Sequence, residues 1–161
     1  MVDDVVVDTN VIIDAVAPDD ESNEMTCRYI LYSLIERQEY SISLDIEYEI
    51  LKEYKNKLNN RKTPQTNDFE DLIQRYAYSN EDNNVFETRI PVDESKVEEL
   101  SDQGFHDEDL IFVRLGPASR SESIISSDEE SIMEDEYKSW IEDNLEVTVC
   151  LPDDAENNIL D

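Results

Sequence analysis

The sequence predicts an α/β fold, a three-layer α/β/α sandwich around a central, mostly parallel sheet. Short β-branched runs alternate with longer segments whose apolar residues recur at helical spacing. This alternation is typical of chains in which each helix returns the backbone to the start of the next parallel strand. The 161 residues contain no internal repeat and no linker, so a single domain is expected.

Runs of β-branched and aliphatic residues mark the predicted strands. The clearest run covers residues 2–7, with Val5, Val6 and Val7 at its centre. A continuous apolar run of this kind is typical of a strand that is buried on both faces. Pro91 cannot donate a backbone hydrogen bond, so the extended stretch around it is expected at a sheet edge or a strand end. The other expected strands cover residues 41–44, 85–92, 124–125 and 147–151.

Apolar residues at helical spacing, together with capping residues, mark the predicted helices. The third helix is expected to open at Asp45. Its apolar stripe recurs every four residues, at Ile46, Ile50, Tyr54 and Leu58. The other helices are expected to start near Val11 and to cover residues 20–38, 64–76, 93–100, 110–115 and 132–141.

The domain is predicted over residues 1–151, followed by a loose acidic C-terminal tail over residues 152–161. Cys27 and Cys150 lack a metal-ligand spacing and are expected to pack as small buried side chains. The chain opens without the basic region of a signal peptide, and no apolar run approaches the roughly 20 residues of a membrane span. We therefore expect a cytoplasmic protein. Its two glycines cannot supply the glycine-rich loops that bind nucleotide phosphates.

The net charge of −29, from 13 basic and 42 acidic residues, needs an explanation. Charges of one sign repel one another in the compact state. Molar salt shortens the Debye length to about 3 Å and screens this repulsion. The composition therefore favours a protein of a salt-loving organism, with a haloarchaeon-like acidic surface. The alternative is an acidic protein that binds a basic partner or imitates nucleic acid.

Carboxylates that follow predicted strands point to a common site. Asp8 ends the first strand and Asp128 follows the strand at residues 124–125, and the carboxyl ends of parallel strands meet at one rim of the sheet. Asp109 begins a helix that can reach this rim, and Glu49 lies beside the apolar stripe of the third helix. Converging carboxylates repel one another unless a cation neutralises them, and Mg²⁺ and Mn²⁺ prefer oxygen ligands. Such a site can activate water for phosphodiester hydrolysis.

Each of these acids also has a purely structural interpretation. Asp8 can cap the helix that follows it, and the helix dipole favours Asp109 in a first helical turn. Asp128 and Glu49 can be solvated acids among many. Neighbouring acids compete for the positions of Glu49 and Asp109, namely Glu47, Glu53, Asp107 and Glu108.

The four acids lie in segments that resemble the PIN-domain nucleases. Residues 5–12, Val-Val-Val-Asp-Thr-Asn-Val-Ile, look like the opening of that family, a hydrophobic strand followed by Asp-Thr-Asn. Residues 43–58 resemble the strand–helix unit that carries the second acid of the family. Residues 107–112 resemble the start of the third-acid helix, and residues 124–128 resemble the strand that ends in Ser/Thr-x-Asp. The segments occur in the order of the family and span nearly the whole chain.

The resemblance implies a PIN-like sandwich with an Mg²⁺- or Mn²⁺-dependent endonuclease activity, usually on RNA. It implies that the four acids bind the metal and act in catalysis, and that Thr9, Asn10 and Ser126 shape the site. Some members are toxins that a small antitoxin protein holds, and relatives often form homodimers, so both partners are expectations here. Arg114 and Leu115 stand where many toxin members have an alanine-rich helix. Toxin and RNA-processing roles therefore both remain open.

Basic residues gather directly after Glu49 and form a candidate substrate groove. Lysine and arginine normally make the contacts to phosphate, and between positions 52 and 62 the only acid is Glu53. The alternative is a basic helix end that the helix dipole favours. The basic residues of this segment are Lys52, Lys55, Lys57, Arg61 and Lys62, with Arg114 and Arg120 as weaker candidates elsewhere. His106, the single histidine, is expected to be an ordinary loop residue.

The first functional hypothesis is therefore a metal-dependent endoribonuclease, with RNA and DNA both open as substrates. The second is a catalytically inactive PIN-fold interaction module. The third is an acidic nucleic-acid mimic that occupies a basic partner. A mimic needs acids spread over its surface and has no use for Asp8 at a strand end.

Overall fold

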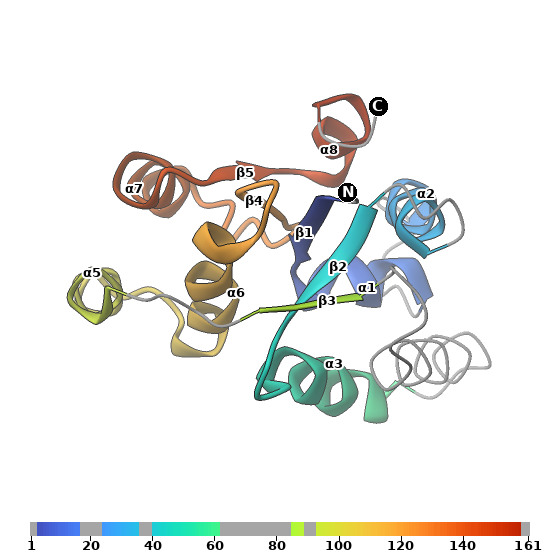
Figure 1. Cartoon of the computed structure of the whole chain (residues 1–161), viewed down its shortest axis with the longest axis horizontal. Coiled ribbons are helices and arrows are strands. Elements are labelled where there is room, and N and C mark those ends of the chain that lie inside the picture. Colours follow the sequence, from blue (N-terminus) through green and yellow to red (C-terminus); the bar gives the residue numbers. More distant parts are fainter. Residues whose placement is uncertain (1–2, 17–23, 36–39, 62–84, 89–92, 159–161) are drawn as a thin grey trace.

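A computed structural model describes residues 3–16, 24–35, 40–61, 85–88 and 93–158, and the structural statements below concern these residues. One five-stranded sheet runs through the molecule in the order β3-β2-β1-β4-β5, and all of its pairings are parallel (Figure 1). The strands are β1 (Asp3–Val7), β2 (Tyr40–Asp45), β3 (Val85–Thr88), β4 (Ser123–Ile125) and β5 (Thr148–Cys150). The predicted α/β fold with a mostly parallel sheet is confirmed.

Helices cover both faces of the sheet and make the three layers of the sandwich (Figure 1). One face carries α1 (Thr9–Val16), α2 (Glu24–Ile35) and α8 (Pro152–Asn158). The other carries α5 (Glu94–Asp102), α6 (Leu110–Leu115) and α7 (Asp135–Leu145). Helix α3 (Glu49–Asn59) packs against both α1 and α6. Two short 3₁₀ turns, Asp107–Asp109 and Gly116–Ala118, lie at the two ends of α6.

Strand β1, at the centre of the sheet, is shielded from solvent. Val5, Val6 and Val7 of β1 are completely buried, which is expected for a parallel strand with helices on both sides. Gly116 lies so close to β4 that a Cβ there would come within 2.9 Å of a side-chain methyl of Ile124. Glycine therefore permits the close approach of the turn after α6 to the sheet.

Most of the predicted elements are confirmed, with ends that differ by a few residues. The strand predicted at residues 85–92 is described only over Val85–Thr88, which form the edge strand β3, and Pro91 lies outside the described residues. The last predicted helix begins at Asp135, so that Ile132 and Met133 lie in the turn before it. The predicted helix over residues 64–76 lies outside the described residues.

The third helix begins four residues later than predicted. Asp45 ends β2, and its two carboxylate oxygens accept hydrogen bonds from the backbone amides of Glu49 and Ile50 at 3.0 and 2.9 Å. Between them the chain turns through Tyr48, whose φ of 59° is left-handed. Because this turn precedes the helix, Ile46 is 41% exposed and is not part of the buried stripe.

The chain beyond β5 is folded, so the prediction of a loose tail from Pro152 is wrong over most of its length. Residues Pro152–Asn158 form α8. This helix packs against α2 and buries Ala155 completely. The apolar contact explains why an acidic segment is helical here, since most helical stability in proteins comes from packing.

Both cysteines are buried free thiols, as predicted. Burial raises the pKa of the Cys27 and Cys150 thiols to about 12, so neither is a reactive thiolate near neutral pH. None of the helices over the described ranges is long and apolar enough to cross a membrane.

Candidate functional site

The carboxyl ends of β1 and β4 lie side by side and bring Asp8 next to Ser126. The amide of Asp8 donates a backbone hydrogen bond to the Ile125 carbonyl at 2.9 Å. The Ser126 hydroxyl donates to Oδ2 of Asp8 at 2.6 Å. Only 1% of Asp8 is exposed, and Ser126 is completely buried. The parallel pairing of β1 with β4 thus fixes an aspartate at the end of the central strand.

Asp128 is held over the same strand ends by residues of two elements. The Ser126 hydroxyl accepts a hydrogen bond from the Asp128 amide at 3.1 Å. The side-chain amide of Asn10, in the first turn of α1, donates to Oδ2 of Asp128 at 2.9 Å. Oδ1 of Asp128 accepts from the amide of Glu130 at 3.0 Å. Asn10 and Ser126 therefore orient Asp8 and Asp128 through these hydrogen bonds.

Asp109 approaches Asp8 and Asp128 from the face of the sheet that carries α6. It ends the 3₁₀ turn before α6, and its Oδ2 accepts a hydrogen bond from the Ser131 hydroxyl at 2.5 Å. Burial raises the pKa of Asp109, and the negative charge of Asp128 raises it further. Asp107, one of its rivals, is exposed and accepts a hydrogen bond from Ser101. The structure thus favours Asp109 over Asp107 as the third acid.

Asp8 is the most perturbed acid of the group. Its pKa is raised from 3.8 to about 7, and burial is the largest cause. The charges of Asp109 and Asp128 contribute to this rise, while the Ser126 hydroxyl and the backbone of Asn10 lower the pKa. Its Oδ1 is buried and has no hydrogen-bond partner, and neither has the hydroxyl of the adjacent Thr9. Buried polar atoms without partners are costly and call for an explanation such as a bound water or ion.

Glu49 does not join the three aspartates, contrary to expectation. Its side chain is 54% exposed, and its Oε1 pairs with the Lys52 ammonium at 2.6 Å. Glu53, one helical turn later, is 21% exposed. Burial raises the pKa of Glu53, and among the nearby charges those of Glu108 and Asp109 also raise it. Glu53 is therefore the acid of α3 that lies in the field of Asp109. The helical period could have shown this, because position 53 is nearer to the buried stripe than position 49.

The basic residues that were predicted to form a substrate groove have different neighbours in the structure. Lys57 lies at the acidic rim, where its ammonium is 2.9 Å from Oε2 of Glu108 and 3.9 Å from Oε1 of Glu53. Lys52 pairs with the exposed Glu49 instead. Lys55 and Arg61 are half-buried on α3 and just after it, and Lys62 lies outside the described residues. Lys57 is thus the candidate substrate contact with the clearest position.

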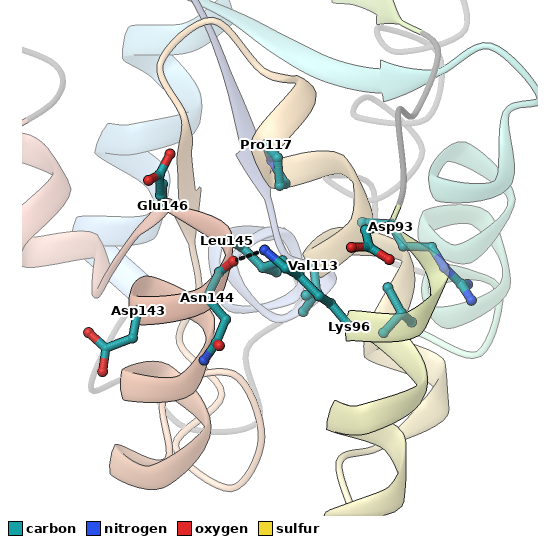
Figure 2. A pocket seen from close by; sticks show the side chains of 10 residues that line it. Asp93, Lys96, Val113, Pro117, Asp143, Asn144, Leu145 and Glu146 are labelled. Atoms are coloured by element: carbon teal, nitrogen blue, oxygen red, sulfur yellow. Dashed lines mark hydrogen bonds between the residues drawn. The ribbon is translucent and has the colours of Figure 1, made fainter.

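Arg114, a weaker substrate candidate, lies on α6 and pairs with Glu94 at 3.3 Å, and its contact with a substrate stays a prediction. It lines a pocket of about 440 Å³ between α5, α6 and α7. Figure 2 shows Lys96 crossing this pocket to donate a hydrogen bond to the Asn144 carbonyl at 2.6 Å. Leu145 and Glu146 of the pocket lead into the start of β5. The pocket therefore lies toward the amino ends of the strands, whereas Asp8 and Ser126 follow their carboxyl ends.

The donor chemistry of the Asp8 group suits a hard divalent cation, because carboxylate oxygens are the ligands that Mg²⁺ and Mn²⁺ prefer. The buried, unpartnered Oδ1 of Asp8 supplies one such ligand. Over the described ranges, however, no three or more His, Cys, Asp or Glu side chains are arranged to hold a metal ion together. A cation would therefore have to draw the other carboxylates toward Asp8.

No protein-family model matches this chain, and no curated protein matches its sequence. The assignment of a function therefore rests on the residues themselves.

Proposed function

We propose that this protein is a metal-dependent nuclease of the PIN type, an endoribonuclease that hydrolyses phosphodiester bonds. The observation that carries the proposal is the buried carboxylate of Asp8, which has an unpartnered oxygen and lies in the field of Asp109 and Asp128. A fold gains nothing in stability by burying such a group. A cation that binds there would compensate for the cost.

The residues proposed to hold Mg²⁺ or Mn²⁺ are Asp8, Asp109 and Asp128. The bound metal would neutralise charge on a phosphate and activate water for hydrolysis. The contacts of Asn10 and Ser126 hold the carboxylates of Asp8 and Asp128 in a fixed orientation. Such supporting hydrogen bonds tune metal affinity in many proteins.

Two further features support the nuclease. The Asp-Thr-Asn sequence after the central strand and the order of the later acids resemble the PIN family. Lys57 lies where a phosphate next to the aspartates would meet a positive charge. RNA as substrate, a small protein partner of the antitoxin kind, a homodimer and a cytoplasmic location are expectations from the same resemblance and composition.

The test is a calorimetric titration of Mn²⁺ into the full chain and its Asp8→Asn variant, with cleavage of labelled RNA and DNA measured on the same samples. Asp143→Asn is the matched control, because Asp143 is an exposed aspartate on α7 at the other end of the sheet. Binding and cleavage that survive in Asp143→Asn and disappear in Asp8→Asn are expected. Failure of the wild type to bind Mn²⁺ would refute the metal site.

A catalytically inactive interaction module is the second candidate. Two observations favour it, namely the lack of a ready-made ligand set over the described residues and the outward position of Glu49. It predicts that Mn²⁺ binds, or fails to bind, without cleavage of RNA or DNA under any salt condition. Metal-dependent cleavage by the wild type would exclude it.

A further inference from the structure

The pocket of about 440 Å³ between α5, α6 and α7 has both cationic and apolar side chains in its lining. Its volume lies within the range of about 300–1,000 Å³ that is usual for small-molecule sites. Lys96 and Arg114 are the basic residues among those that line it. Val97 and Val113, which are 5% and 0% exposed, add apolar surface. The lining therefore suits a small ligand that carries an anionic group beside an apolar one.

Arg114 has a hydrogen-bond donor that lacks an acceptor. The Nη2 atom of its guanidinium group lies 3.3 Å from Oε2 of Glu94. Its Nε atom is buried and has no hydrogen-bond partner among the residues that the structure describes. The arginine side chain carries donors only, and a buried donor without an acceptor is costly. An acceptor atom of a ligand in the pocket would satisfy Nε.

Lys96 offers further donors to the same ligand. Figure 2 shows its side chain reaching from α5 to the end of α7, where its ammonium donates to the Asn144 carbonyl at 2.6 Å. An ammonium carries three protons, and this carbonyl takes one of them. Carboxylate oxygens accept strong, charge-assisted hydrogen bonds from such groups. A ligand carboxylate in the pocket therefore has two cationic side chains to meet.

The acidic residues of the pocket argue against a ligand that is only an anion. Asp93, Asp143 and Glu146 also line it, so its lining has two positive and three negative charges. The whole chain carries a net charge of −29. This charge repels a plain anion, whereas a zwitterion carries no net charge and is not repelled as a whole. A ligand with both a carboxylate and an ammonium therefore suits the pocket best.

Asp93 holds a carboxylate in place for the ammonium of such a ligand. It is the N-cap of α5, where its Oδ1 accepts from the Ser95 amide at 3.1 Å and from the Ser95 hydroxyl at 2.6 Å. The hydrogen bond from the Ser95 side chain lowers the pKa of Asp93, so its carboxylate is ionised at neutral pH. Figure 2 shows the carboxylates of Asp143 and Glu146 pointing away from Lys96. Asp93 is therefore the acid that best suits the ligand ammonium.

We propose that this pocket binds a free amino acid with an aliphatic side chain. The carboxylate of the ligand accepts hydrogen bonds from the Lys96 ammonium and from Nε of Arg114, and its ammonium donates to Asp93. Its side chain packs against Val97 and Val113. The pocket lies toward the amino ends of the strands, so the inference does not depend on the metal site proposed at their carboxyl ends.

The experiment is equilibrium dialysis of labelled leucine against the full chain, at one fixed KCl concentration. Two analogues of leucine compete with it, namely isopentylamine, which lacks the carboxylate, and isocaproate, which lacks the ammonium. Leucine is expected to bind at a single site. Isopentylamine should bind about tenfold or more weakly than leucine, because it cannot accept from the buried donor. Isocaproate should bind about threefold or more weakly, because it loses a more exposed ion pair.

Three variants assign these effects to residues. Arg114→Met keeps an apolar stem and removes the donor, so it should weaken leucine binding by about tenfold or more and leave isopentylamine binding unchanged. Asp93→Asn keeps a good N-cap residue and removes the charge, so it should weaken leucine binding by about threefold and leave isocaproate binding unchanged. Lys138→Met is the matched control and should stay within about twofold of the wild type. Lys138 is 34% exposed, as Arg114 is, and its ammonium lies 3.8 Å from Glu142 outside the pocket.

Thermal melts of the variants separate loss of folding from loss of binding, and Asp93→Asn provides the test if Arg114→Met does not fold. A wild type that retains no leucine on dialysis would overturn the inference. Equal binding of leucine by the wild type, Arg114→Met and Asp93→Asn would do the same, since leucine would then bind elsewhere. Isocaproate that binds as tightly as leucine would overturn the assignment to amino acids. The nuclease proposal rests on Asp8 and stands or falls separately.

Discussion

Replacing Asp8 by asparagine should stabilise the metal-free protein, although it removes the proposed key ligand. Burial raises the pKa of Asp8 from 3.8 to about 7, and each factor of ten in proton affinity is about 1.36 kcal/mol. Holding the ionised carboxylate in the fold at pH 8 therefore costs about 4 kcal/mol. Asparagine has the same shape, cannot ionise and can still accept the Ser126 hydrogen bond, so the variant avoids this cost.

The gain in stability from Asp8→Asn should increase with pH. A carboxyl group whose folded-state pKa is raised contributes stability below its unfolded pKa of 3.8, and that contribution is lost as the pH rises to about 7. The advantage of Asp8→Asn should thus be about 4 kcal/mol at pH 8 and about 2 kcal/mol at pH 5.5. For a chain of this size, each kcal/mol raises the melting temperature by about 2–4 °C.

The assay is urea unfolding in the presence of EDTA at both pH values, with Asp143→Asn as the exposed control. An Asp8→Asn variant that is no more stable than the wild type at pH 8 would refute the reasoning. So would an equal gain at both pH values, because the gain would then have a cause other than ionisation of Asp8.

The remaining predictions concern metal, packing and salt. Mn²⁺ at 100 times its Kd should stabilise the wild type by about 2.7 kcal/mol in urea unfolding and leave Asp8→Asn unchanged; a similar gain in both proteins would place the metal elsewhere. Tyr54→Phe should cost about 1–3 kcal/mol, because the buried Val7 carbonyl loses its O–H donor, and a loss below 0.5 kcal/mol would show that this contact is replaced by water. With a net charge of −29, the melting temperature should rise between about 0.1 and 2 M KCl as repulsion is screened. A melting temperature that does not respond to KCl would contradict the salt-loving interpretation.

Much of the fold and the positions of three of the four candidate acids follow from local pattern. The valine run of β1 and the short run of β4 predict buried parallel strands, and parallel strands put their carboxyl ends on one rim. This rule alone brings Asp8 and Asp128 together. Asp109 follows because it directly precedes an apolar helix that packs on the sheet.

The start of α3 was mispredicted from the sequence, because a side chain and not the apolar periodicity determines the backbone conformation there. The carboxylate of Asp45 accepts hydrogen bonds from two amides of the next helix, which delays the start of α3 and leaves Ile46 outside the buried stripe. Glu49 faces solvent for a different reason, because the helical period turns position 49 away from that stripe. Arg114, a weaker candidate for substrate binding, lines the pocket between α5, α6 and α7.

The site joins residues that are far apart in the sequence, and this has a consequence for its synthesis. Asn10 bonds to Asp128 and Ser126 bonds to Asp8, each across 118 positions. The central strand β1 pairs with β4 on one side, and this pairing cannot form until β4 has been synthesised. A nascent chain therefore emerges from the ribosome with Asp8 long before any residue that orients it. Contacts of this separation slow folding, so the unfinished polypeptide cannot hold Asp8 and Asp128 in their final orientation, and only the complete chain can.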